Sequence, residues 1–185
     1  AAGRAATATV AITPVNDAPT AGANLGLTLA EGATAVLDGT RLKTDDVDNT
    51  TAQLVYTVTN LPAHGTLKLN GAALLTNGTF TQADLDAGNV TYTHDSSENF
   101  SDGLKFTVTD GEFTLSTATF ALTITPVNDA PTAGLNLGLT LAEGGTAVIS
   151  GSALKTNDVD NSSAQLIYTV TNLPTHGAVK LNGAA

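Results

Sequence analysis

The acidic side chains of this sequence gather in short motifs beside predicted turns. The clearest motif is Asp46-Val47-Asp48-Asn49, which recurs as Asp158-Val159-Asp160-Asn161. Calcium takes six to eight oxygen ligands at about 2.3 to 2.6 Å, and alternating carboxylates with a nearby amide supply such oxygens. The same residue types also cap turns without any metal, by hydrogen bonding to their own backbone. The motif therefore predicts either a calcium site or a pair of Asx turns.

The histidines and carboxylates do not form a recognisable catalytic set. The sequence has three histidines and no cysteine, so thiolate metal sites and a cysteine nucleophile are excluded. The run from His94 to Ser97 contains the residue types of a catalytic triad, but neighbouring side chains on a strand point to opposite faces. The sequence contains no nucleophile elbow, phosphate-binding loop or zinc-binding helix motif. We predict that the chain is not an enzyme.

The sequence repeats itself over a domain-sized distance. The string PVNDAP begins at Pro14 and again at Pro126, 112 residues later, and the 60 residues that start at each proline differ at only 13 positions. This predicts three segments: residues 1–13 as the C-terminal strand of a preceding repeat, residues 14–125 as a complete repeat, and residues 126–185 as the N-terminal half of the next. The last segment should expose edge strands and apolar surface, because the strands that would cover it are missing.

The apolar residues of the complete repeat alternate with Thr, Ser and Lys, which is the pattern of half-buried strands. An aromatic core and one helical turn, Thr81–Gly88, are also predicted. Seven short strands indicate an all-β sandwich. The predicted strands are Asn24–Ala30, Thr34–Leu37, Gln53–Thr59, Gly65–Leu69, Val90–His94, Gly103–Thr109 and Thr114–Thr125. The predicted core aromatics are Tyr56, Phe80, Tyr92, Phe106 and Phe120.

The charge and composition of the chain exclude several partners. With 17 acidic and 7 basic residues the formal charge is −10, which repels phosphate backbones and anionic lipid surfaces. The sequence also lacks an apolar stretch of 18 residues, so no membrane insertion is predicted in this segment. Tandem arrays of near-identical domains usually provide length, avidity or display.

Several motifs in order resemble the cadherin-like family, in particular the chondroitin sulfate proteoglycan type of tandem repeat found in large bacterial surface adhesins. These are Glu31, the DVD of Asp46 to Asp48, the TDG of Thr109 to Gly111 and PVNDAP, together with NLPAHGTLKLNG and FTQADLDAGNVTYTHDSSENFSDGLKFTVTDG. The resemblance covers the whole chain. It implies an antiparallel Greek-key β-sandwich of the cadherin or immunoglobulin type, repeated in tandem.

In cadherins, calcium lies between successive domains, and the resemblance implies the same arrangement of ligands here. One junction would use Glu31, Asp95 or Glu98, Asn128, Asp129, Asp158 and Asp160, and the matching half of the junction upstream would use Asn16, Asp17, Asp46, Asp48 and Asp110. The linker departs from the cadherin pattern D-x-N-D-N, because Pro126 and Ala130 replace an acid and an Asn and remove two oxygen donors. Asp45 becomes Asn157 in the next copy, so this position does not need a charged ligand.

The resemblance implies a calcium-stiffened spacer or display repeat of a large secreted or cell-surface adhesin of a bacterium. The partners of each repeat would be the neighbouring repeats of the same chain. The alternative is a binding module that contacts a glycan or another copy of the protein and gains avidity from repetition. An exposed aromatic or apolar patch on a sheet face would favour that alternative.

Overall fold

The computed structural model of the protein describes residues 2–5 and 7–184. It divides into two units, Ala1–Val127 (unit 1) and Asn128–Ala185 (unit 2). Residues 1, 6 and 185, which fall in the predicted segments 1–13 and 126–185, lie outside the described residues. The predicted segment boundaries stay a prediction. The described residues of 1–13 form no strand.

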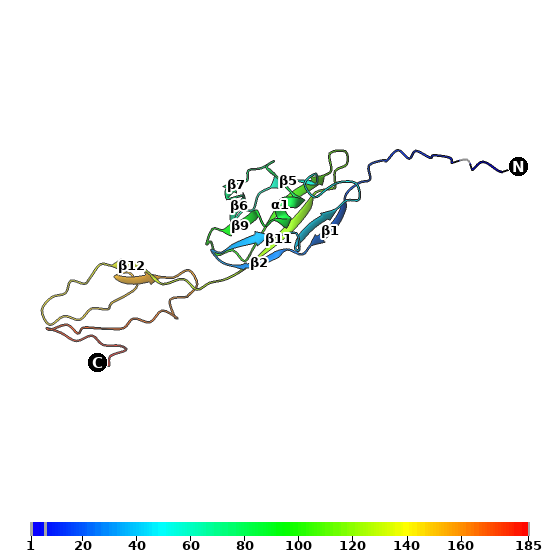
Figure 1. Ribbon diagram of the computed structural model, residues 1–185. Helices are drawn as coiled ribbons and strands as arrows, with labels where there is room; N and C mark the ends of the chain where they lie inside the picture. The colour runs from blue at the N-terminus through cyan, green and yellow to red at the C-terminus, as the bar shows by residue number, and fades with distance from the viewer. Residues whose placement is uncertain (1, 6, 185) are drawn as a thin grey trace. The chain divides into compact units, whose positions relative to one another are not determined.

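Unit 1 is a sandwich of two sheets with a short strand pair beside them (Figure 1). The first sheet has the order β2 (Leu27–Ala30), β11 (Ala118–Thr125), β10 (Ser101–Thr109), β5 (Val55–Asn60) and β8 (Thr79–Thr81). The second has the order β3 (Thr34–Leu37), β9 (Val90–His94), β6 (Gly65–Leu69) and β7 (Ala72–Ala73). The additional pair joins β1 (Thr20–Asn24) and β4 (Leu42–Asp45). The predicted all-β sandwich is confirmed, with antiparallel pairing throughout unit 1 except between β2 and β11, which are parallel.

The predicted aromatic core is confirmed. Alternation places every second side chain of a strand inside, so that Tyr56 and Val58 of β5 are fully buried. Tyr56 stacks on Phe80 of β8 with ring centroids 5.0 Å apart, and its ring also contacts Phe106 of β10. Tyr92 and Phe120 complete the set of buried aromatic residues that the sequence predicted. These residues close the core between the two sheets.

The predicted helical turn is present as α1 (Gln82–Asp86). Thr81 caps it: its hydroxyl accepts from the main-chain N–H of Asp84, and the Asp84 carboxylate accepts from the N–H of Thr81. This reciprocal arrangement is a capping box. Gln82 is fully buried and accepts from Tyr56 Oη at 2.7 Å, so the helix is fixed to β5 by a hydrogen bond as well as by packing.

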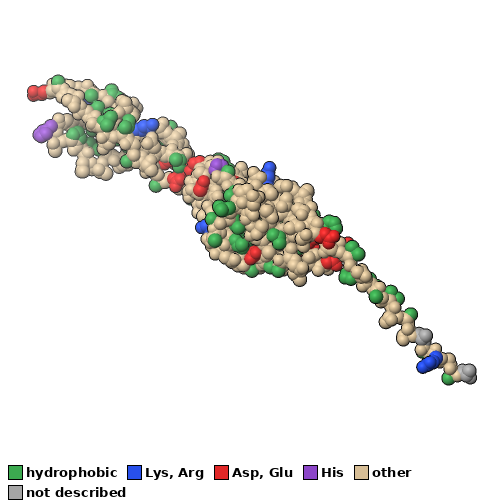
Figure 2. All heavy atoms as spheres, turned by 90° about the horizontal axis from the view of Figure 1, so that it is seen from above, with side chains coloured by type: hydrophobic (Ala, Val, Ile, Leu, Met, Phe, Trp, Pro, Cys, Tyr) green, Lys and Arg blue, Asp and Glu red, His purple; other side chains and the backbone are tan. Residues whose placement is uncertain are grey.

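Acidic side chains gather at two ends of unit 1 (Figure 2). One group surrounds the segment that leads into β1, and the other lies where β2 and β9 end. The sandwich therefore separates two acidic surfaces along the direction of its strands.

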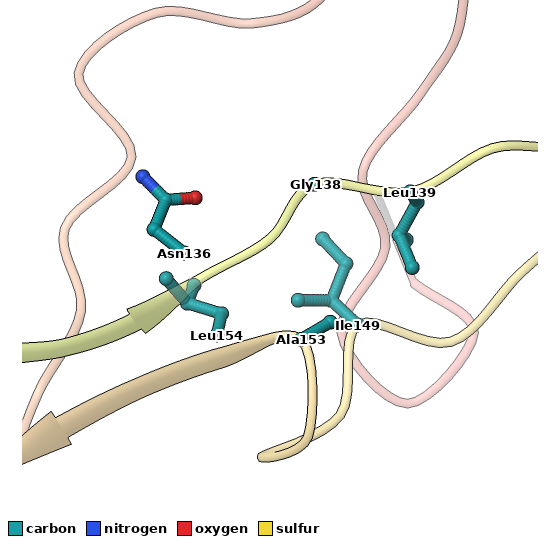
Figure 3. A pocket seen from close by; sticks show the side chains of 6 residues that line it. All are labelled: Asn136, Gly138, Leu139, Ile149, Ala153 and Leu154. Atoms are coloured by element: carbon teal, nitrogen blue, oxygen red, sulfur yellow. The ribbon is translucent and has the colours of Figure 1, made fainter.

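Among its described residues, unit 2 contains the counterparts of β1 and β4. Its strands β12 (Thr132–Asn136) and β13 (Leu154–Asn157) pair with the same register as β1 and β4. The side chains of Leu139, Ile149 and Leu154 line an open hollow (Figure 3). Their counterparts in unit 1 are buried: Leu27, the counterpart of Leu139, is 7% exposed, whereas Leu139 is 44% exposed. The apolar surface predicted for this segment is thus present.

Candidate metal centre

The first end of unit 1 carries five residues that the sequence predicted as ligands, which we call the N-terminal cluster: Asn16, Asp17, Asp46, Asp48 and Asp110. The structure brings these residues together although they come from three separate segments. The side-chain amide of Asn16 donates to Asp110 Oδ2 at 2.9 Å, across 94 residues of sequence. The main-chain N–H of Asp17 donates to Asp48 Oδ2 at 2.8 Å. These two bonds tie the PVNDAP segment to the DVDN loop and to the turn after β10.

The DVDN loop is folded around the carboxylate of Asp46. Asp46 Oδ1 accepts from the main-chain N–H groups of Asp48 and Asn49, each at 2.8 Å. Asp46 Oδ2 and Asn49 Oδ1 are buried atoms that accept no hydrogen bond from the described residues. A buried acceptor without a partner is costly, and an anionic one more so. The loop therefore forms the Asx turn that the sequence predicted as an alternative, and it also leaves two oxygen atoms available to a cation.

Asn49 is an oxygen donor that the predicted ligand set did not include. Its position directly after Asp46-Val47-Asp48 is the only signal in the sequence, and it does not distinguish the side chain of Asn49 from an ordinary turn residue. The burial of its Oδ1 becomes visible only in three dimensions. Asp45, by contrast, forms an ion pair with Lys43 at 2.7 Å.

The electrostatics of the N-terminal cluster favour a cation. Among the described residues, the ion pair between Lys43 and Asp45 lies nearby but does not involve the cluster, so no Lys or Arg side chain pairs with Asp17, Asp46, Asp48 or Asp110. Burial acts to raise the pKa of Asp110, but hydrogen bonds from the N–H groups of Phe113 and Glu112 and from Asn16 outweigh it and lower that pKa. Asp110 therefore stays ionised down to an acidic pH.

The second end of unit 1 carries the C-terminal cluster, which we define as Glu31, Asp95 and Glu98. The carboxylates of Glu31 and Glu98 offer oxygen atoms within 4.8 Å of one another. Glu31 Oε2 accepts from the N–H of Val127 at 3.3 Å, and its Oε1 is buried without a hydrogen bond from the residues that the structure describes. Of the predicted alternatives Asp95 and Glu98, it is Glu98 that lies beside Glu31.

Asp95 serves its own turn instead. Its Oδ1 accepts from the hydroxyl of Ser97 at 2.5 Å and from the Ser97 N–H at 3.0 Å. The hydroxyl of Ser97, together with its N–H, holds the pKa of Asp95 below the ordinary value. The geometry gives Asp95 the role of a turn cap and places Glu98 beside Glu31.

Unit 2 reproduces the loop geometry of the N-terminal cluster at Asn128, Asp129, Asp158 and Asp160, which we call the unit 2 cluster. The N–H of Asp129 donates to Asp160 Oδ2 at 2.6 Å, and Asp158 Oδ1 accepts from the N–H groups of Asp160 and Asn161 at 2.9 and 2.7 Å. Asp158 Oδ2 is buried and accepts no bond from the described chain, like Asp46 Oδ2. The arrangement thus forms without the β10 and β11 strands that complete unit 1.

The three clusters offer only carboxylate and amide oxygen atoms. Such hard donors suit calcium or magnesium, and a mixed set of side chains on flexible turns suits calcium better, because calcium accepts more ligands and less regular geometry. Four buried acceptors without partners among the described residues fit the calcium ion that the resemblance implies: Glu31 Oε1, Asp46 Oδ2, Asn49 Oδ1 and Asp158 Oδ2.

Asp102 has a structural role in unit 1. Asp102 accepts from the N–H groups of Ala63, His64 and Gly103 and from the hydroxyl of Tyr92, all between 2.8 and 2.9 Å. It thereby holds the loop before β6 against β9 and β10.

The described part of the chain contains no helix with the length and apolar character that a membrane crossing requires.

The chain is similar to several known proteins, among them extracellular matrix proteins. It is 32% identical to human extracellular matrix organizing protein FRAS1 over 92% of this chain, and 34% identical to human FRAS1-related extracellular matrix protein 1 over 94%. It is also 39% identical to human chondroitin sulfate proteoglycan 4 over 57% of its length. The chain spans only 4%, 8% and 4% of these relatives, respectively. The profile of the cadherin-like family matches residues 19–124 and 131–185, and the chain belongs to this family.

Proposed function

We propose that this chain is a structural repeat of an extracellular protein, in which calcium ions at the ends of the repeats stiffen a tandem array. In this proposal the C-terminal cluster and the unit 2 cluster together supply the ligands of one junction. As the resemblance implies, these ligands would be Glu31, Asp95 or Glu98, Asn128, Asp129, Asp158 and Asp160. The bacterial adhesin named by the resemblance remains a prediction, whereas the names of the relatives support an extracellular setting.

The observation that carries the proposal is the duplicated loop. Asp46 and Asp158 each use Oδ1 to hold two main-chain N–H groups and leave Oδ2 buried without a partner. A purely structural Asx turn needs only the first of these oxygens. The second oxygen is a buried negative charge that costs stability unless a cation binds it.

Calcium would also act on the stability of the repeat. The converging carboxylates of the N-terminal cluster repel one another, and a divalent ion reverses this repulsion. Binding to the folded state alone stabilises it by about 2.7 kcal/mol when free calcium is a hundredfold above the Kd. An extracellular calcium concentration would thus keep the repeats ordered.

The distribution of aromatic residues favours a spacer over a glycan-binding module. Five aromatic side chains of unit 1 lie in the core, and Phe100 and Phe113 are the exposed ones. Phe100 precedes β10 and Phe113 follows it, so the nine residues of β10 separate them by roughly 30 Å. Two single aromatic rings at opposite ends of a strand do not form a stacking platform for a sugar.

The test is a calcium titration of the chain by isothermal titration calorimetry, with magnesium as the comparison ion. We expect saturable calcium binding that falls in the double variant Asp46→Asn and Asp158→Asn. The matched control is Asp45→Asn, which changes the neighbouring acid to the residue found at position 157 and should bind as the wild type does. Absence of calcium binding by the wild type would reject the proposal.

A further inference from the structure

His94 is the last residue of β9, and its side chain is fully buried. Its Nδ1 accepts hydrogen bonds from the main-chain N–H of Gly32 at 3.2 Å and of Ser96 at 3.3 Å. A ring nitrogen that accepts carries no proton, so the proton of the neutral ring is on Nε2. Nε2 lies 3.9 Å from Asp95 Oδ1 and has no hydrogen-bond partner among the described residues. Nδ1 is therefore the atom through which this ring holds other parts of the chain.

The two N–H groups that Nδ1 accepts belong to the two turns of the C-terminal cluster. Gly32 directly follows Glu31, and Ser96 stands two residues before Glu98. The turns are also in direct contact, since a Cβ on Gly32 would lie 2.6 Å from the hydroxyl oxygen of Ser96. Gly32 has a φ of +66°, which a residue with a side chain rarely adopts. Glycine is therefore favoured at this position.

Two main-chain hydrogen bonds anchor the backbone on either side of Gly32. The N–H of Glu31 donates to the carbonyl of Thr125 at 2.9 Å, and the N–H of His94 donates to the carbonyl of Ala33 at 3.0 Å. These bonds fix the turn of Glu31 to β9 and β11. The 95–98 turn is fixed to the turn of Glu31 through Ser96 and the ring of His94.

We propose that His94 is the positioning residue of the C-terminal cluster, which holds Glu31 and Glu98 at the separation that calcium binding needs. The inference rests on the proposed function. A single buried acceptor joins both turns, so its loss removes the acceptor of the Gly32 and Ser96 N–H groups and frees one turn from the other. The oxygen atoms of Glu31 and Glu98, now within 4.8 Å, would then no longer be held for an ion. His94 itself does not contact the ion in this proposal.

The experiment compares two replacements of His94 that differ in the acceptor. His94→Asn places its Oδ1 close to the position of Nδ1 and keeps the acceptor, whereas His94→Leu fills the space and removes it. Calcium affinity is measured by calorimetry on the whole chain, and the unfolding midpoint of each variant is measured in chelator. We expect His94→Leu to weaken calcium binding at least about tenfold, as the loss of a group that orients a metal ligand does, and His94→Asn to restore most of the affinity.

The outcomes separate the inference from the proposed function. A wild-type chain that binds no calcium overturns both. A folded His94→Leu chain with the calcium affinity of the wild type overturns the inference alone, as does a His94→Asn chain as weak as His94→Leu. If His94→Leu does not fold, His94→Gln takes its place, because its acceptor lies one methylene farther out; unchanged affinity of that variant would likewise overturn the inference.

Discussion

The main-chain N–H of Asp17 donates to the carboxylate of Asp48, 31 residues later, at 2.8 Å. Asp129 and Asp160 repeat this bond in unit 2 at 2.6 Å. The bond uses only one oxygen of each carboxylate and orients the PVNDAP segment against the DVDN loop. One carboxylate oxygen of this aspartate thus stabilises each loop, and its other oxygen stays available to a cation.

Replacing Asp46 by Asn should lower the stability of the repeat in calcium but not in chelator. In chelator we expect the variant to be as stable as the wild type or more stable, because the change removes a buried negative charge at Oδ2. In saturating calcium we expect it to be less stable, by about 1.4 kcal/mol for each tenfold loss of affinity. Urea unfolding in the two buffers measures both values.

Asp45→Asn is the control for this calcium dependence, since Asp45 is ion-paired with Lys43 on an exposed surface. Its stability should respond to calcium as the wild type does. A loss of stability by Asp46→Asn that is equal in calcium and in chelator would show that Asp46 is only a turn cap.

Asp102→Asn should destabilise the repeat regardless of calcium. The two oxygens of Asp102 accept from three N–H groups and from the Tyr92 hydroxyl. In Asp102→Asn an NH₂ group would replace Oδ2, and this donor would face the donors of His64 and Tyr92. We expect a loss of about 1 to 3 kcal/mol in the free energy of unfolding. Glu112→Gln, on an exposed carboxylate, is the control and should leave stability unchanged.

The pH dependence of Asp102 follows from its hydrogen bonds. Burial acts to raise its pKa, but the N–H groups of Ala63, His64 and Gly103 and the hydroxyl of Tyr92 outweigh this and lower the pKa. A lowered pKa contributes stability above the unfolded value of about 3.9, and this contribution is lost as the pH falls through the folded value. Unfolding free energies between pH 2.5 and 6 should show a shallower acid slope in Asp102→Asn than in the wild type; equal slopes would contradict this assignment.

Tyr56→Phe should lower the free energy of unfolding by about 1 to 2 kcal/mol, because it leaves buried acceptors without their donor. The Tyr56 hydroxyl lies 2.7 Å from Gln82 Oε1 and 2.8 Å from Thr44 Oγ1, and all three residues are buried. Burial raises the pKa of Tyr56 to about 12. A raised pKa gives stability that is present below the unfolded value of about 10 and is lost as the pH rises towards 12. Denaturant unfolding between pH 8 and 12 should show part of this alkaline loss disappear in Tyr56→Phe. An unchanged alkaline slope would contradict the account.

The period-2 pattern predicted the strands that alternate clearly. Strands β3, β6 and β9 have the bounds that the sequence predicted, and α1 lies within the predicted turn. The predicted strand Asn24–Ala30 is instead divided between β1 and β2 by Gly26, whose φ is +68°. β4 was missed because its four residues Leu42–Asp45 lead directly into the acidic loop, and β8 because three residues are too few for a period to be recognised.

The candidate ligands were found by residue type and repetition, but their geometry was not. The sequence named both Asp95 and Glu98, and only the fold shows that Asp95 caps its turn while Glu98 lies beside Glu31. The buried oxygen of Asn49 and the double acceptor role of His94 depend on contacts between distant segments or on burial. Such relationships leave no periodic signal in a sequence.

The decisive measurement is the unfolding midpoint of the chain in calcium, in magnesium and in chelator. We expect a midpoint that rises with calcium concentration, that falls on chelation, and that magnesium does not restore. A midpoint that is the same in all three buffers would contradict the claim that calcium binds and stabilises these repeats.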